Sequence, residues 1–174
     1  EGVAEATFLA MAGLTRLGML DVVRSAIAPD EMLPAVAQGA IGIERRHQDE
    51  AAARLLAPIH HDPTGQRIAA ERAFLAVAMN ARYGGEARTP APDTVNRLLS
   101  EKGQKRARAL GLAMRLACDL SGRSPQLLAN ATATVEKGAL RVTAANGYAD
   151  MLLGEQTKRR AKALAEAMDL ALKI

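Results

Sequence analysis

Residues 69–90, AAERAFLAVAMNARYGGEARTP, decide how this chain is organised. Their many Ala, Leu and Met residues predict one continuous helix, because these residues have high helix propensity. Asp62 followed by Pro63 predicts where that helix starts, as an N-cap and first-turn pair. Gly84 and Gly85 predict where it stops. The residues on either side differ in composition, so the helix is expected to join two dissimilar segments.

The composition favours helices and divides the chain in two. Hydrophobic residues make up 49% of the 174 residues, yet there are two Phe, two Tyr and no Trp, so the core must be built from Ala, Leu, Val, Ile and Met. Residues 1–87 carry 8 Arg and 11 acids, a net charge of −3, whereas residues 88–174 carry 15 basic residues and 8 acids, a net charge of +7. We therefore expect two domains, 1–85 and 86–174.

The cysteine content and the length of the apolar runs indicate the cellular compartment. A single cysteine, Cys118, excludes an internal disulfide and suits the cytoplasm. No apolar run reaches the roughly 20 residues that span a bilayer, so no membrane association is expected. The chain starts at Glu1, within an apolar pattern and without an initiator Met, which is typical of a fragment.

Local signals predict a mainly α fold with a small α+β part at the C-terminal end. The run Ala6–Ala10 fits either a buried strand or the first turns of a helix that ends at Gly18. Alternation predicts a strand over Ala40–Glu44, and Lys137-Gly138 predicts a two-residue β-hairpin turn. Further helices are predicted over Gln48–Leu56, Thr94–Leu99, Glu101–Leu120 (capped by Ser100 and ended by Gly122), Pro125–Ala129 and Glu155–Leu172.

One predicted apolar stripe along a helix includes the cysteine. Leu110, Met114, Ala117 and Cys118 recur at helical spacing in the helix from Glu101. We expect this stripe to face the core, with Cys118 acting as a small hydrophobe rather than as a nucleophile.

Three blocks resemble the porphobilinogen deaminase (hydroxymethylbilane synthase) family. They are EATFLAMAGLTRLG at 5–18, LPAVAQGAIGIERR at 33–46 and IHHDPTGQRIAAERAFLA at 59–76, and they occur in the order found in the middle of that enzyme. The resemblance covers about residues 1–76. It implies an enzyme that joins porphobilinogen units into a linear tetrapyrrole on a dipyrromethane cofactor.

The resemblance also implies where the site is incomplete. Arg16 matches an arginine that faces the acidic side chains of the pyrroles, while Gln38 and Gly39 match a loop near the cofactor. These three are vestigial candidates for cofactor binding, and the alternative for Arg16 is an exposed cation that interacts with the dipole at the C-terminal end of a helix. The cofactor cysteine is expected near Ala87, where no cysteine stands, and Ala37 replaces a glycine of the loop. No catalytic residue and no bound cofactor are therefore expected.

A second resemblance runs over residues 73–174. The blocks RYGG at 82–85, RALGLAMRLACDLSG at 108–122, LLAN at 127–130 and the EKGALRV hairpin resemble the C-terminal region of the exopolyphosphatase/guanosine pentaphosphatase family. The resemblance implies the end of a helical domain and a small α/β domain, without the phosphate-binding loops. The junction between the two resemblances is expected within residues 67–82, so the architecture is interpreted as chimeric or truncated.

Two groups of basic residues are candidates for binding polyanions. A phosphate chain would release counterions on binding them, whereas the alternative is two solvated helix faces. Scarce aromatic residues argue against single-stranded nucleic acid. The candidates are Lys102, Lys105, Arg106, Arg108, Lys158, Arg159, Arg160 and Lys162. Adjacent His60 and His61 lack further ligands at useful spacing, so no metal site is expected.

These features lead to one functional hypothesis and two alternatives. The hypothesis is a mosaic of two truncated enzyme segments without catalysis, acting as a binding module for a polyanion such as polyphosphate or for a protein partner. Apolar faces left exposed by truncation would favour such a partner or self-association. The first alternative is a fragment of a porphobilinogen deaminase, in tetrapyrrole biosynthesis. The second is the C-terminal regulatory, polyphosphate-binding part of an exopolyphosphatase.

Overall fold

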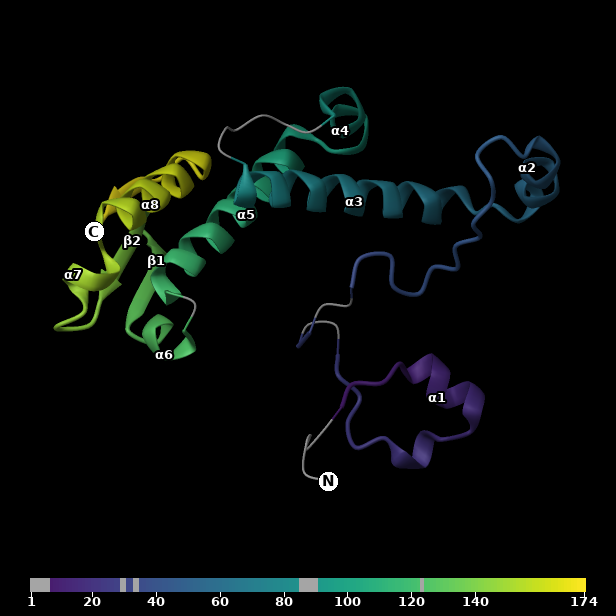
Figure 1. Cartoon of the computed structure of the whole chain (residues 1–174), viewed down its shortest axis with the longest axis horizontal. Helices are drawn as coiled ribbons and strands as arrows, with labels where there is room; N and C mark the ends of the chain where they lie inside the picture. Colours follow the sequence, from purple (N-terminus) through teal and green to yellow (C-terminus); the bar gives the residue numbers. More distant parts are fainter. Residues whose placement is uncertain (1–6, 29–30, 33–34, 85–90, 123) are drawn as a thin grey trace. The chain divides into compact units, whose positions relative to one another are not determined.

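The computed structural model describes residues 7–28, 31–32, 35–84, 91–122 and 124–174. They form mainly helices with a small α+β part, as predicted, and the sheet of that part has three strands rather than the two of the expected hairpin (Figure 1). The chain divides into two units, Glu1–Gln38 and Gly39–Ile174. No described helix has the length and apolar character needed to cross a membrane.

The first unit contains one short helix. Helix α1 (Met11–Leu17) ends at Gly18, whose φ of 68° is the left-handed conformation that glycine adopts without a steric penalty. A single 3₁₀ turn, η1 (Leu20–Val22), follows. The run Ala6–Ala10 was expected to be a strand or the first turns of this helix. Residues 7–10 form neither, since they have no regular structure, and Ala6 lies outside the described residues.

The segment that opens the second unit has no strand. The prediction of a strand over Ala40–Glu44 is wrong, since residues 40–46 have no regular structure. A strand is stable only when a neighbour pairs with its backbone, and the strands among the described residues pair with one another and not with this segment. The predicted helix near Gln48 does form, as α2 (Glu50–Leu56) with Asp49 as its cap, followed by the 3₁₀ turn η2 (Ala57–Ile59).

The long central helix is confirmed. Helix α3 (Asp62–Tyr83) carries Pro63 in its first turn and stops at Gly84, while Gly85 lies outside the described residues. Its N-cap is His61 rather than Asp62, which is a shift of one residue.

Helix α3 packs against the next two helices. They are α4 (Pro92–Leu98) and α5 (Glu101–Ser121). The C-terminal end of α3 crosses α5 (Figure 1). The Ser100 side chain accepts a hydrogen bond from the Gly103 N–H at 3.1 Å, as an N-cap should. Buried side chains fill the contact: Ala73, Val77, Ala78, Val95 and Ala107.

The buried face of α5 is not the predicted one. Ala107, Gly111, Leu116 and Leu120 are buried, whereas Leu110 is 46% exposed and Cys118 is exposed. The prediction of a core thiol is therefore wrong. Gly111 leaves room for the Ala78 carbonyl of α3, while Leu116 and Leu120 are buried in the cluster with residues of β2 and α8.

The C-terminal part combines the sheet with the remaining helices. After α6 (Pro125–Leu128), the strands β1 (Ala131–Glu136) and β2 (Ala139–Ala144) form the predicted hairpin. Its two turn residues, Lys137 and Gly138, both have positive φ, as a two-residue turn of type I′ requires. Helices α7 (Ala149–Leu152) and α8 (Glu155–Ala167) follow.

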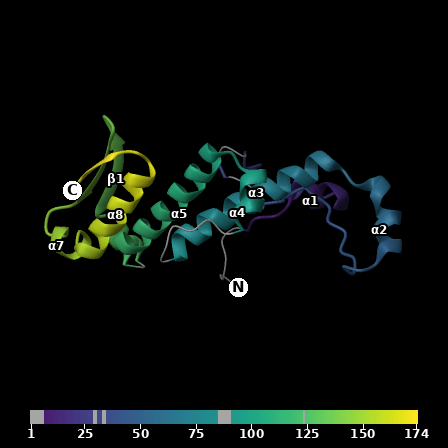
Figure 2. The same ribbon diagram turned by 90° about the horizontal axis from the view of Figure 1, so that it is seen from above.

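The last residues pair with the sheet. The closing helix, predicted to reach Leu172, ends at Ala167, and β3 (Ala171–Lys173) pairs in parallel with β2. The strand order is β1-β2-β3, and α8 lies beside the sheet (Figure 2). The core between them and α5 consists of Leu116, Leu120, Leu140, Val142, Leu152, Ala161, Leu164 and Ala165.

Candidate functional site

The three candidates for cofactor binding lie on exposed backbone. Arg16 is in the last turn of α1, with an exposed side chain. Gln38 and Gly39 lie in a turn at the end of the first unit and the start of the second. The exposed guanidinium of Arg16 is placed where an anionic group from solution can reach it.

The same turn holds a strained residue. Ala37 adopts a φ of 64°, in the left-handed region, and Gly39 follows with a φ of 82°. A residue with a Cβ atom pays about 1 kcal/mol or more in this conformation, whereas glycine does not. The glycine expected at position 37 from the family resemblance is thus the residue that this backbone favours.

A hollow of about 720 Å³ lies between the segment after Gly39 and the start of α3. Its polar side chains are Arg45, His60, His61 and Thr64, and the rest of its lining is apolar or glycine. His60 Nε2 lies 3.1 Å from Asp62 Oδ1, and His61 Nδ1 lies 2.7 Å from Thr64 Oγ1. Both imidazoles are therefore held by neighbours along the chain, within one turn of the helix start.

Neither histidine belongs to a metal cluster. Within the described ranges there is no group of three or more His, Cys, Asp or Glu side chains arranged to hold an ion. The apolar lining is also open to solvent, since Ile41 is 89% exposed and Ile59 is 66% exposed.

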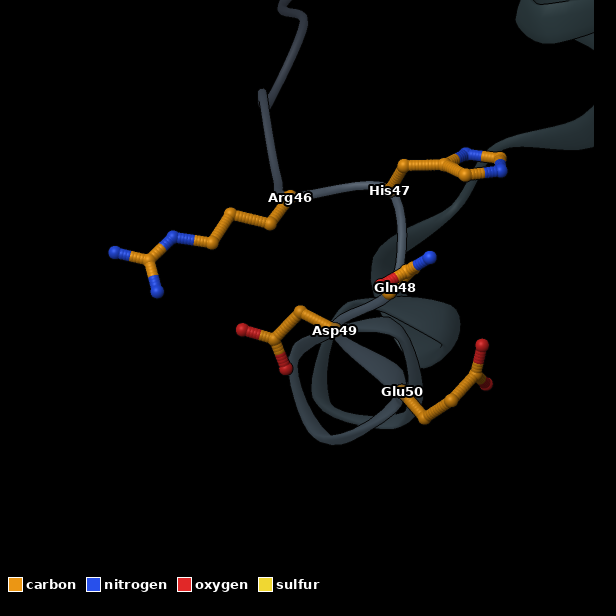
Figure 3. A pocket seen from close by; sticks show the side chains of 5 residues that line it. All are labelled: Arg46, His47, Gln48, Asp49 and Glu50. Atoms are coloured by element: carbon orange, nitrogen blue, oxygen red, sulfur yellow. The ribbon is translucent and has the colours of Figure 1, made fainter.

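A second hollow, of about 500 Å³, surrounds the turn before α2. Figure 3 shows that the side chains of Arg46 and His47 extend in opposite directions and that the carboxylates of Asp49 and Glu50 also point apart. Asp49 Oδ1 accepts a hydrogen bond from the Ala52 N–H at 2.9 Å, so this carboxylate caps the helix. The hollow has no converging polar groups.

Acidic side chains pair with predicted polyanion-binding residues on both helices. Lys105 pairs with Asp169, and Arg160 Nε lies 3.4 Å from Asp119 Oδ2. Lys158 and Lys162 pair with Glu155 at 3.0 Å and Glu166 at 3.9 Å. These carboxylates reduce the positive potential that a polyanion would meet. The other predicted residues, Lys102, Arg106, Arg108 and Arg159, lie on the same two helices.

The structure adds a group of side chains around the thiol that the sequence did not indicate. Arg82 Nη2 lies 3.5 Å from Cys118 Sγ, and the Arg82 guanidinium lies 4.9 Å from the centre of the Tyr83 ring. Arg115 Nη1 donates a hydrogen bond to the Gly84 carbonyl at 2.8 Å. Because α3 and α5 are far apart in sequence, only their packing brings these groups together.

Comparison with known proteins finds similarity to one family in the first residues of the chain. Residues 1–54 match the model of the dipyrromethane cofactor binding domain of porphobilinogen deaminase. Three similar relatives are a porphobilinogen deaminase from Paracoccus denitrificans (61% identical over 90 residues), one from Sphingopyxis alaskensis (53% over 90 residues) and the chloroplastic enzyme of Pisum sativum (50% over 90 residues).

The similarity covers only part of this chain and only part of each relative. It covers 52%, 51% and 52% of this chain and 27%, 26% and 23% of the respective relatives. The chain thus spans about a quarter of the length of the curated relatives it matches.

These matches correct the functional hypothesis. The expectation of a non-catalytic mosaic acting as a binding module is wrong, because the family model and the relatives favour the alternative, a porphobilinogen deaminase fragment. The exopolyphosphatase resemblance of residues 73–174 and the chimeric architecture gain no support from these matches and stay predictions. Over about half of its length, the chain is similar to porphobilinogen deaminases.

Proposed function

We propose that this chain acts as part of a porphobilinogen deaminase, in tetrapyrrole biosynthesis, through its N-terminal residues. The observation that carries the proposal is the 61% identity over 90 residues with the Paracoccus denitrificans enzyme. The match of residues 1–54 to the cofactor-binding domain supports it independently of any single relative.

Within this proposal, Arg16 binds a carboxylate of the pyrrole chain. Its guanidinium is exposed at the end of α1, and a guanidinium presents paired N–H donors that match the two oxygens of a carboxylate. Gly18 fixes the end of the helix, which positions the last turn that carries Arg16.

The apolar side chains of this region also suit a part of a larger enzyme. Phe8 is 74% exposed, Leu17 is 72% exposed and Ile41 is 89% exposed. Exposed side chains of this size favour burial against further protein.

The proposal is tested by exchanging segments. Residues 1–54 would replace the corresponding stretch of the Paracoccus denitrificans enzyme, and the rate of porphobilinogen consumption would be measured. We expect the exchanged enzyme to remain active, because the exchanged residues are expected to supply the same carboxylate contacts. A folded, soluble exchanged enzyme without activity would disprove the proposal.

The role of Arg16 is tested in the same exchanged enzyme. Arg16→Ala should lower kcat/KM by about 10- to 100-fold, which corresponds to the loss of one hydrogen-bonded charge pair. Arg16→Lys should restore part of the loss, because the positive charge returns without the paired donors. Arg24→Ala, which removes another exposed arginine of the same unit, is the matched control and should leave kcat/KM unchanged.

A further inference from the structure

Strand β1 forms one edge of the sheet, since the strand order is β1-β2-β3 (Figure 1). Directly before β1, the Asn130 carbonyl accepts a hydrogen bond from the Ala145 N–H at 2.8 Å. In an antiparallel pair every second residue exchanges such bonds with the residue opposite. The backbone bonds to β2 therefore fall at the even-numbered residues of β1. The odd-numbered residues turn their N–H and C=O groups to the open side of the strand; they are Ala131, Ala133 and Val135.

This open edge lacks the features that usually prevent a further strand from pairing. Proteins protect exposed edges with lysine, proline or a β-bulge. The sequence of β1, ATATVE, contains neither residue, its one charge is Glu136 at the last position, and its pairing with β2 runs through every residue without a bulge. Apart from the hairpin itself, the described residues supply no hydrogen-bonded partner to this edge. The outward N–H and C=O groups are thus available to another strand.

The same edge leaves apolar side chains uncovered. Val135 lies opposite Leu140 and Ala133 lies opposite Val142, and directly opposite residues point to the same face of a sheet. Leu140 and Val142 are buried in the core, whereas Val135 is 55% exposed and Ala133 is also exposed. The apolar face of the sheet therefore continues to the edge without being covered there.

We propose that β1 pairs antiparallel with β1 of a second copy of this chain, about a two-fold axis at Ala133, so that the two sheets become one. In this register Ala131 lies opposite Val135 of the second copy, and the outward backbone groups of both strands face one another as hydrogen-bonded pairs. Val135 gains an apolar neighbour. Glu136 lies opposite Asn130 of the second copy, so no like charges meet along the strand. The edge is complementary to itself, which is why a second copy is the partner that fits it.

Analytical ultracentrifugation of the full chain tests the pairing. The weight-average mass should rise with concentration from the 18.4 kDa of one chain towards twice that value. The range to cover is about 10 µM to about 1 mM, because an interface below the standard size gives weak complexes. Ala133→Pro should keep the mass of one chain throughout and retain the far-UV circular dichroism, since proline removes an N–H that faces away from β2. A chain that stays monomeric at every concentration would overturn the proposal, as would a dimer that persists in this variant.

Charges placed at the two-fold axis test the register without changing the backbone. Position 133 lies opposite itself in the proposed pairing, so Ala133→Lys and Ala133→Glu should each stay monomeric, because like charges meet. An equimolar mixture of the two variants should dimerise. Thr143→Lys is the matched control: it adds the same charge at an exposed position of the central strand β2 and should leave association unchanged.

Two results of this second experiment would overturn the proposal. Self-association of Ala133→Lys by itself would place the contact on another surface, such as the exposed apolar side chains of residues 7–59. A mixture of the Lys and Glu variants that stays monomeric would show that position 133 does not lie opposite itself.

Discussion

Gly111 is the residue on which the packing of the two long helices depends. A Cβ atom at this position would lie 2.0 Å from the Ala78 carbonyl oxygen and 2.9 Å from the Ala81 Cβ atom. Neither neighbour is the far end of a flexible side chain, so α3 and α5 would have to move apart. Gly111→Ala should therefore lower the free energy of unfolding by roughly 3 kcal/mol, at the upper end of the range for overpacked cores.

The measurement is urea denaturation followed by far-UV circular dichroism, with Gly103→Ala as the matched control. Gly103 lies on the same helix, and the atom nearest to its added Cβ is Ser100 Oγ at 3.4 Å, which is ordinary contact. Because alanine has the higher helix propensity, the control should be more stable by about 0.5 kcal/mol. Equal effects of the two substitutions would show that α3 does not contact α5 as described.

At the scale of an element, α5 depends on its cap. Ser100 Oγ accepts a hydrogen bond from the Gly103 N–H, which is one of the four N–H groups that have no partner inside the helix. Ser100→Ala should lower the free energy of unfolding by about 1 kcal/mol. Ser100→Asp keeps an acceptor at the cap and should stay within about 0.5 kcal/mol of the unaltered chain. If both variants lost the same stability, the hydroxyl would be important for a reason other than capping.

At the scale of the whole molecule, stability is expected to be uneven. Leu14 is the one buried hydrophobic residue among the described residues before Ala73, whereas the region from α3 onward contains both hydrophobic clusters. Hydrogen exchange followed by mass spectrometry should show protected amides in α3, α5, β2 and α8, and rapid exchange over residues 7–59, because local opening requires little free energy where few side chains are buried. Protection of α2 equal to that of α5 would contradict this distribution.

Only those residues of the candidate site that stand inside the family-like sequence blocks could be predicted. Arg16, Gln38 and Gly39 could be named because they stand inside blocks that resemble a known family. The left-handed conformation of Ala37 could not be read from the residue itself, since alanine does not favour it. The contact of Arg82 with Cys118 joins residues 36 positions apart, so no local pattern indicates it.

The ends of α5 and the hairpin turn were determined by the sequence alone. Ser100 and Gly122 set the ends of α5, and Lys137-Gly138 sets the turn, because caps and tight turns are satisfied by residues next to one another in the chain.

Tertiary structure decided the rest. Residues 40–44 do not form a strand, whereas Ala171 and Leu172, predicted as the end of a helix, lie in strand β3. A strand exists only where another strand supplies partners for its backbone, and β2 supplies them to β3. The buried face of α5 was likewise decided by its neighbours: the α3 backbone approaches at Gly111, and Leu116 and Leu120 pack with residues of β2 and α8.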